Sequence, residues 1–305
     1  MKIIFMGTPD FAVYSMDAIQ ERGDEIALVI SQEDRPRDRG KKIQPTPVKQ
    51  RAQELEIEVY QPLSIKIEEA FEKIDRIKPD LIVVTAYGQI IPKRILEVPK
   101  YGCINVHASL LPRHRGAAPI HFALINGDEK TGITTMYISE ALDTGDMILK
   151  DELDILEEDD LKSLHDKLAI LSKKTLKETL DRIENGSAER HRQCEECATY
   201  APLIKKEMGH IDFSKTPEEI KNISRALSAY AKLNGNTIKL WQAEVGEEVE
   251  GRAFGEIYRV NKDNIEVVAK GKTIKFYEIQ IPNKKRMRVE DFLKGNEIET
   301  GAFFE

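Results

Sequence analysis

Three polar residues in the middle of the chain could together carry out the transfer of an acyl-type group. Asn105 and His107 form an Asn-x-His pair, and Asp143 follows in the motif Leu-Asp-Thr-Gly-Asp. An amide and a protonated imidazole can bind an oxygen on which negative charge develops, and a carboxylate can accept a proton. The segment after His107 is too rich in Gly and Pro to be an ordinary helix or strand. This combination indicates an active site.

Each of these residues also has a structural interpretation when it is considered alone. Asn105 could cap a turn, His107 could be a satisfied polar group, and Asp143 before Thr-Gly could form an Asx-turn. Their position favours function, because the Asn-x-His pair ends the apolar segment 102–106 and open α/β sheets bind ligands at the C-terminal ends of parallel strands. Asp146 is a second carboxylate in the same motif, and spacing alone does not choose between it and Asp143.

The first 188 residues show apolar runs without polar alternation, which is typical of strands covered on both faces. The predicted strands are residues 2–6, 25–30, 81–85, 103–106 and 134–138. Helices are expected between them, including one capped by Thr8 with Pro9 in its first turn and a long one over about 160–184. We therefore predict an α/β fold for residues 1–188, with a Rossmann-like, mostly parallel sheet and helices on both faces.

The remainder of the chain predicts a linker over residues 189–206 and a smaller domain over 207–305. The smaller domain opens with a capping box, Thr216 to Glu219, at the start of a helix. Short segments rich in Val, Ile, Tyr and Trp then alternate with Gly, Asn and Asp. These segments are residues 237–245, 255–260, 265–269 and 273–281. The pattern predicts an antiparallel β-barrel.

Two cationic clusters stand out in a chain whose net charge is -7. An acidic protein can bind a polyanion only through such local clusters. The first lies in a segment whose prolines and glycine oppose a long helix, and its cations are Arg35, Arg37, Arg39, Lys41, Lys42, Lys49 and Arg51. The second contains Lys284, Lys285 and Arg286, together with Arg288. Long loops are more often functional than not, so we interpret the first cluster as a binding segment and leave the second as either a binding segment or solvated surface.

Several classes of function are disfavoured by missing motifs. The turn Gly7-Thr8-Pro9-Asp10 lacks the glycines that a dinucleotide pyrophosphate requires, and no Walker A motif is present for ATP. Cys194 and Cys197 form a C-x-x-C motif near His191, but a closed zinc site needs four ligands, so no metal is expected. With no apolar run of about 20 residues and an N-terminus that leads directly into a predicted strand, we expect a cytoplasmic protein without membrane association.

The motifs of this chain, taken in order, resemble those of the methionyl-tRNA formyltransferase family within the folate-dependent formyltransferases. They are residues 3–11, the loop 34–42, the segment 86–92, the Asn-x-His and Leu-Asp motifs, and residues 237–241. The Asn-x-His and Leu-Asp motifs are shared by the whole superfamily and indicate the reaction, whereas the cationic loop indicates the substrate. The resemblance implies that the formyl group of 10-formyltetrahydrofolate is transferred to the amino group of methionine on initiator tRNA, with no metal and no obligate protein partner.

The resemblance also implies roles for individual residues. Asn105 and His107 would bind the oxyanion, while Asp143 would favour the charged form of His107 and accept the proton of the amine. The donor would lie against an apolar slot formed by Tyr87, Gly88, Gln89, Ile90, Ser109, Leu110, Leu111, Pro112 and Leu142. The tRNA would be bound by Arg35, Arg37, Arg39, Lys41, Lys42, Lys284, Lys285 and Arg286. The C-terminal barrel would be OB-like, a fold that often binds nucleic acid.

Some alternatives remain open at this level. Arg113 and Arg115 could pair with anionic groups of the folate or the tRNA, or they could be bystanders. The same chemistry could formylate an amino sugar or a small ribonucleotide amine, or hydrolyse the formyl folate, but such substrates need no cationic loop. A non-catalytic RNA-binding module would not need Asn105, His107 and Asp143 together, and such modules usually interleave more aromatic residues than the 7% found here.

Overall fold

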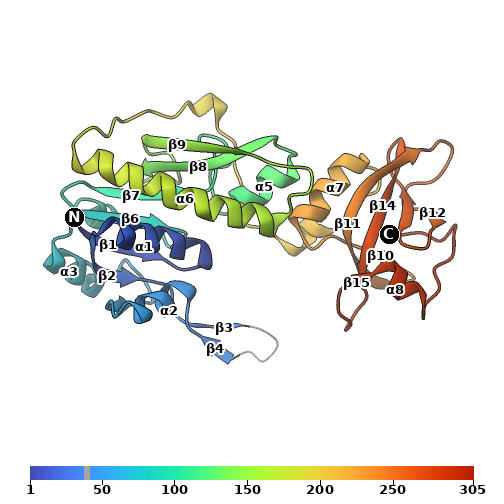
Figure 1. Ribbon diagram of the computed structural model, residues 1–305, viewed down its shortest axis with the longest axis horizontal. Coiled ribbons are helices and arrows are strands. Elements are labelled where there is room, and N and C mark those ends of the chain that lie inside the picture. The colour runs from blue at the N-terminus through green and yellow to red at the C-terminus, as the bar shows by residue number, and fades with distance from the viewer. Residues whose placement is uncertain (38–41) are drawn as a thin grey trace. The chain divides into compact units, whose positions relative to one another are not determined.

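The computed structural model describes residues 1–37 and 42–305, and the side chains of Arg37 and Lys42 are also left undescribed (Figure 1). The predicted tRNA-binding residues Arg39 and Lys41 therefore lie outside the described residues. The chain forms two units. Unit 1 comprises Met1–Pro119, Lys130–Asp154 and Ser163–Ala201, and unit 2 comprises Ile120–Glu129, Ile155–Lys162 and Pro202–Glu305.

In the described part of unit 1, a seven-stranded sheet has the order β5-β2-β1-β6-β7-β8-β9. Its strands are β1 (Lys2–Gly7), β2 (Glu25–Ile30), β5 (Val59–Tyr60), β6 (Leu81–Thr85), β7 (Cys103–His107), β8 (Lys130–Tyr137) and β9 (Met147–Asp154). The neighbours from β5 to β7 pair in parallel, while β8 and β9 are antiparallel. Every residue of β6 is buried, as expected for a strand with helices on both sides of its sheet. The predicted Rossmann-like, mostly parallel sheet is confirmed.

The helices α1 (Asp10–Arg22) and α6 (Leu161–Glu184) lie on one face of this sheet. Ser15 of α1 accepts a hydrogen bond from Thr85 of β6, and Thr179 of α6 is 2.7 Å from Thr135 of β8. The two helices are joined by ion pairs from lysines of α6 to Glu21 of α1. One predicted detail is wrong: Thr8 does not cap α1.

The Thr8 hydroxyl instead donates to the carbonyl of Tyr87 at 3.0 Å, so it joins the loop after β1 to the loop after β6. Pro9 occupies the cap position, and no side-chain hydrogen bond caps α1. On the opposite face, α3 (Glu68–Ile77) and α4 (Lys93–Leu96) pack Ile74 and Ile95 against β1 and β6. The remaining described elements of unit 1 are β3 (Arg35–Arg37), β4 (Lys42–Gln44), α2 (Pro47–Glu54) and the short helix η1 (Glu195–Cys197).

Unit 2 is built on an antiparallel sheet whose order is β10-β11-β14-β13-β12, with β15 paired to β14 (Figure 1). The strands are β10 (Tyr230–Leu233), β11 (Asn236–Glu248), β12 (Ile257–Val260), β13 (Ile265–Val268), β14 (Lys272–Gln280) and β15 (Met287–Arg288). The helices are α5 (Pro119–Ile125), η2 (Lys206–Gly209), α7 (Pro217–Ala226) and α8 (Val289–Leu293). The sheet curls into a half-barrel, which confirms the predicted small barrel fold.

The predicted capping box of α7 is also confirmed. The Glu219 amide donates to the Thr216 hydroxyl at 3.3 Å, and the Thr216 amide donates to the Glu219 carboxylate at 2.9 Å. None of the helices within residues 1–37 and 42–305 has the length and apolar composition that crossing a bilayer requires.

Candidate functional site

Strand β7 places Asn105 and His107 on the same face of the sheet, because side chains alternate along a strand. Asn105 lies opposite Met136 of β8, and His107 lies opposite Thr134. This is the face away from α6, which contacts the neighbouring residue Thr135. Asn105 is half-buried, and its amide has no hydrogen-bond partner among the described residues. The amide is therefore available to a ligand.

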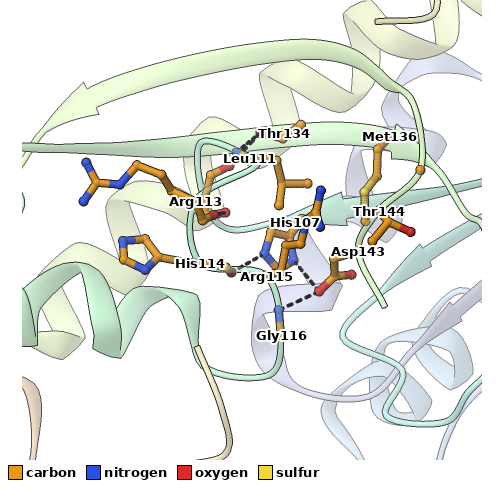
Figure 2. A network of polar contacts seen from close by, with 12 residues as sticks. His107, Leu111, Arg113, His114, Arg115, Gly116, Thr134, Met136, Asp143 and Thr144 are labelled. Carbon is orange, nitrogen blue, oxygen red and sulfur yellow. Dashed lines mark hydrogen bonds and ion pairs between the residues drawn. The ribbon is translucent and has the colours of Figure 1, made fainter. Parts of the chain in front are cut away.

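His107 is held between a carbonyl and a carboxylate, as Figure 2 shows. Its Nε2 is 2.9 Å from the carbonyl oxygen of His114, and since a carbonyl can only accept, Nε2 must carry a proton. Its Nδ1 lies 3.7 Å from Oδ2 of Asp143, which is an ion-pair distance but too long for a hydrogen bond. When the ring is charged, Nδ1–H is therefore the donor that remains available to a third group.

The loop between β8 and β9 supplies Asp143, so this carboxylate does not come from the end of a parallel strand. Its Oδ2 accepts a hydrogen bond from the backbone amide of Gly116 at 2.8 Å (Figure 2). Asp146 points to a different partner, with Oδ2 3.7 Å from Nη1 of Arg190. The geometry thus brings Asp143, and not Asp146, to His107, a choice that the spacing alone left open and that the family resemblance made in favour of Asp143.

Two glycines explain how the loops approach so closely. Gly116 has a φ of 120°, and a Cβ added to it would lie 2.7 Å from the carbonyl oxygen of Ala201. A Cβ on Gly145 would lie only 1.7 Å from the carbonyl oxygen of Tyr137. Both positions leave no room for a side chain, so the glycines of the Arg-Gly and Thr-Gly motifs are needed for the close approach of the backbone.

The loop after β7 is fixed by its own hydrogen bonds. Ser109 Oγ donates to the carbonyl of Arg113 at 2.7 Å, and the Thr134 hydroxyl donates to the carbonyl of Ser109 at 2.6 Å. The same hydroxyl accepts from the amide of Leu111 at 3.1 Å, while the Leu111 side chain is buried with Met136. Ser109 and Leu111 are therefore buried residues that hold the loop against β8, whereas Leu110 and Pro112 are half-buried.

The other residues predicted to line the donor site differ in exposure. Tyr87 is buried, and Gln89 is occupied by the backbone amide of Ile65, which donates to its Oε1 at 2.8 Å. Gly88 is exposed, as is Ile90 with an exposed fraction of 69%; Leu142 has an exposed fraction of 62%. Large apolar side chains with this exposure are suited to cover an apolar ligand.

The chain segments that carry Ile90 and Leu142 are joined by an ion pair. The ammonium of Lys93 lies 3.3 Å from the carboxylate of Glu140, so the chain just after Ile90 is linked to the chain just before Leu142. Burial raises the pKa of Tyr87 to about 12, and its hydroxyl has no hydrogen-bond partner within the described residues. Tyr87 is thus a neutral core residue, whereas Ile90 and Leu142 are exposed apolar side chains of these two segments.

Arg115 belongs to the scaffold and not to a ligand-binding surface. Its side chain is completely buried, and its two terminal nitrogens donate to the carboxylate of Glu195 at 2.8 Å each. Its Nε donates to Oε1 of Gln193 at 3.0 Å. The pairing with Glu195 raises the pKa of Arg115. Gln193 and Glu195 were missed in the sequence, because the polar composition of residues 189–206 predicts a linker.

The cations of the first cluster divide into paired and unpaired groups. Lys49 pairs with Asp34 at 2.6 Å and Arg51 with Asp17 at 2.8 Å, so their charges are largely compensated. Strands β3 and β4 form an antiparallel hairpin that presents Arg35, an exposed residue opposite Gln44. The remaining predicted cations of this cluster are Arg37 and Lys42, whose side chains are not described, and Arg39 and Lys41, which lie outside the described residues.

The second cluster lies in the turn between β14 and β15. Lys284 and Lys285 are exposed. Arg286 forms an ion pair with Glu278 and stacks on Trp241, with its guanidinium carbon 4.6 Å from the ring centroid. The exposed lysines are therefore freer than Arg286 to meet an external anion.

Cys194 and Cys197 are exposed thiols. They interact with each other, and this hydrogen bond lowers the pKa of Cys194 and raises that of Cys197. In the part of the chain that the structure describes, no group of three or more His, Cys, Asp and Glu side chains is arranged to hold a metal ion.

Two family models match this chain. Residues 1–180 match the formyl transferase model, and residues 203–297 match the model of the formyl transferase C-terminal domain. The chain is 50% identical to the methionyl-tRNA formyltransferase of Clostridioides difficile (strain 630), over 99% of both chains. It is 46% identical to the methionyl-tRNA formyltransferase of Bacillus subtilis (strain 168), over 98% of this chain and 96% of that one.

Solved structures of more distant proteins share the fold. A sugar 3N-formyl transferase, WlaRD, superposes with a TM-score of 0.68 at 21% identity, over 93% of this chain and 99% of that chain. HypX from Aquifex aeolicus in complex with tetrahydrofolic acid gives a TM-score of 0.65 at 16% identity, over 100% of this chain and 50% of that chain. At these identities the likeness extends to the fold alone.

Proposed function

The chain belongs to the formyl transferase family, and from this premise we propose that it transfers the formyl group of 10-formyltetrahydrofolate to the amino group of methionine on initiator tRNA. The similarity to methionyl-tRNA formyltransferases covers both units at 46–50% identity, whereas the sugar formyl transferase shares 21%. This difference favours a tRNA substrate over an amino sugar. The observation that carries the chemistry is the approach of Asp143 to His107 on the same strand face as Asn105, whose amide has no hydrogen-bond partner among the described residues.

The transfer needs a site for an oxyanion. When the methionine nitrogen attacks the formyl carbon, a C–N bond forms and negative charge develops on the formyl oxygen. Within the described residues, the Asn105 amide has no hydrogen-bond partner, and Nδ1 of His107 has only the Asp143 carboxylate at 3.7 Å, so both groups can donate to this oxygen. Loss of one such donor typically lowers the rate about 100- to 1,000-fold. Asn105 and His107 would therefore bind the tetrahedral intermediate.

The transfer also moves a proton. The attacking amine must lose a proton, and the folate nitrogen must gain one when its bond to the formyl carbon breaks. Asp143 is suited to accept the first proton, because Gly116 occupies Oδ2 while Oδ1 forms no hydrogen bond within the described residues. The carboxylate of Asp143, 3.7 Å from Nδ1 of His107, would also attract the ring electrostatically when the ring is charged.

The formyl donor would lie against the exposed apolar side chains of Ile90 and Leu142. A pterin ring is flat and apolar on its faces, so it gains by covering such side chains, while the exposed backbone at Gly88 can bond its polar edge. The buried residues Tyr87, Ser109 and Leu111 would then shape this site from behind rather than touch the ring. The tRNA would be bound by the exposed cations of the first and second clusters.

A comparison of two neighbouring aspartates tests this proposal. Asp143→Asn and Asp146→Asn make the same chemical change three residues apart, but only Asp143 lies beside His107. With labelled 10-formyltetrahydrofolate and charged initiator tRNA, we expect kcat to fall by about 100-fold or more for Asp143→Asn, and far less for Asp146→Asn. Equal losses, or transfer to amino sugars in preference to the charged tRNA by the unmodified protein, would reject the assignment.

A further inference from the structure

The segment 191–201, which we call the strap, is hydrogen-bonded to both loops of the candidate site. At its start, His191 and Met147 exchange backbone hydrogen bonds of 2.9 and 2.8 Å, which ties the strap to the chain just after the Asp143 loop. Near its end, the amide of Arg115 donates to the carbonyl of Thr199 at 2.8 Å, and the amide of Ala201 donates to the carbonyl of Arg115 at 2.7 Å. The strap therefore spans from the loop of Asp143 to the loop whose His114 carbonyl holds His107.

Between these two attachments, Gln193 contacts the backbone of Asp143 directly. Its Nε2 donates to the carbonyl oxygens of Asp143 and Gly145, at 2.8 Å in both cases. Its Oε1 accepts from Nε of Arg115, which can only donate, so the orientation of the amide is determined by its partners. Both amide protons of Gln193 are thus used to close the Leu-Asp-Thr-Gly turn.

This turn needs such support because Asp143 has a φ of 52°, in the left-handed region. Residues other than glycine persist in that conformation only when their surroundings determine it. Gly145 gives the turn its close approach to Tyr137, and Gly116 holds the carboxylate, but Gln193 is the side chain that holds the carbonyl of Asp143 itself. Without its two hydrogen bonds, the turn could relax and carry the carboxylate away from His107.

The anchor of Gln193 is itself fixed. The guanidinium of Arg115 is fully buried, and a buried charge requires a paired acceptor. Glu195, two residues after Gln193 on the strap, supplies that acceptor through two hydrogen bonds of 2.8 Å. Glu195, Arg115, Gln193 and Asp143 thus form one continuous series of contacts.

We propose that Gln193 is a positioning residue for the formyl transfer, which sets the place of the Asp143 carboxylate by holding the backbone of its turn. The inference rests on the proposed function, because it acts through the proton acceptor assigned there. Gln193 touches no reacting atom. Its effect is on kcat, because a small displacement of a reacting group costs far more in rate than in binding.

The test compares Gln193→Ala with Glu196→Ala, a change of an exposed residue on the same strap. We expect Gln193→Ala to lower kcat by about 10- to 100-fold, the range typical of a misplaced catalytic group, with KM for the charged tRNA within about twofold of the wild type. Glu196→Ala should keep the wild-type kcat. A wild-type kcat in Gln193→Ala would overturn the proposal, whereas an inactive wild-type protein would instead reject the proposed function.

A double-mutant cycle separates positioning from general damage. If Gln193 acts through Asp143, then Gln193→Ala in the Asp143→Asn background should lower kcat by less than about twofold, since the group that it positions is already lost. An undiminished further loss would show a merely structural role and overturn the inference.

If Gln193→Ala melts at a lower temperature than Glu196→Ala, the variant Gln193→Glu repeats the test. This variant keeps the size of the side chain and the contact with Arg115, but it turns a hydrogen-bond acceptor toward the carbonyls of Asp143 and Gly145. A wild-type kcat in that variant would also overturn the proposal.

Discussion

The candidate reaction site and the two cationic clusters use polar residues in opposite ways. At the reaction site, His107 and Asp143 are almost fully buried, and each is aimed by backbone groups, the His114 carbonyl and the Gly116 amide. In the clusters, the exposed residues Arg35, Lys284 and Lys285 extend from hairpin strands and turns. Chemistry at a formyl carbon depends on placement, whereas attraction to phosphates depends on the number of charges and on salt.

This contrast predicts different kinds of defect. Substitutions at the reaction site should lower kcat at every salt concentration. Substitutions in the clusters should weaken binding of the tRNA in a manner that depends on salt. The contrast would fail if a reaction-site variant changed only the affinity for the tRNA, or if a cluster variant abolished turnover at saturating tRNA.

The largest effect is expected from the two donors of β7. Asn105→Ala and His107→Ala should each lower kcat by at least about 100-fold, because each removes one donor to the oxyanion. Steady-state kinetics with charged initiator tRNA would measure this, and thermal melting would show whether the fold is intact. A variant with wild-type turnover would remove its residue from the site.

The sequence could predict that Asn105 and His107 lie at the end of a strand, because the pair ends an apolar segment, and the structure places both on one face of β7. The same argument could not separate Asp143 from Asp146, since the answer depends on how the loop between β8 and β9 folds back over the sheet. Gly116 and Gly145 could be recognised as turn residues, but the backbone atoms that they approach come from distant segments.

The roles of Arg115 and Gln193 could not be predicted from the sequence. The sequence does not show whether an arginine is buried, so Arg115 could equally bind an anion or have no contact with a ligand. In the structure it is buried and pairs with Glu195. The partners of Gln193 are backbone carbonyls, which every residue possesses and which leave no pattern in the sequence. Likewise, Thr8 is a residue type that often caps helices, but its hydroxyl donates to the carbonyl of Tyr87 in another loop.

A smaller, salt-dependent effect is expected from the first cationic cluster. If the loop of residues 35–42 binds phosphates of the acceptor stem, Arg39→Ala and Lys41→Ala should each weaken tRNA binding and reduce the slope of log affinity against log salt by about one unit. KM for the folate should not change, because Ile90 and Leu142 are untouched. Arg35→Ala is expected to behave in the same way.

The measurement is tRNA affinity at several salt concentrations, with Lys162→Ala as the control, which removes one exposed charge outside both clusters. Slopes and affinities identical to those of the wild type in all three cluster variants would remove the loop from the tRNA interface. That result would favour Lys284 and Lys285 as the cations that bind the tRNA. Their ammonium groups form no ion pair within the described residues, whereas Arg286 pairs with Glu278 and stacks on Trp241.

The smallest effect is expected from the two cysteines of the strap. Cys194 and Cys197 are exposed, and within the described residues neither forms a hydrogen bond with the Asp143 turn, which is held by Gln193. Serine is close to cysteine in size, so replacing both should leave kcat, KM and the melting temperature unchanged.

The two cysteines and His191 together supply fewer ligands than a closed zinc site requires, so the double variant should not change the zinc content either. Formyl transfer kinetics and the zinc content of the purified protein would be measured for the wild type and the double variant. Stoichiometric zinc that disappears with the cysteines would contradict the expectation that no metal is bound. A loss of kcat comparable to that of Gln193→Ala would mean that the cysteines also support the Asp143 turn, and the contrast between them and Gln193 would fail.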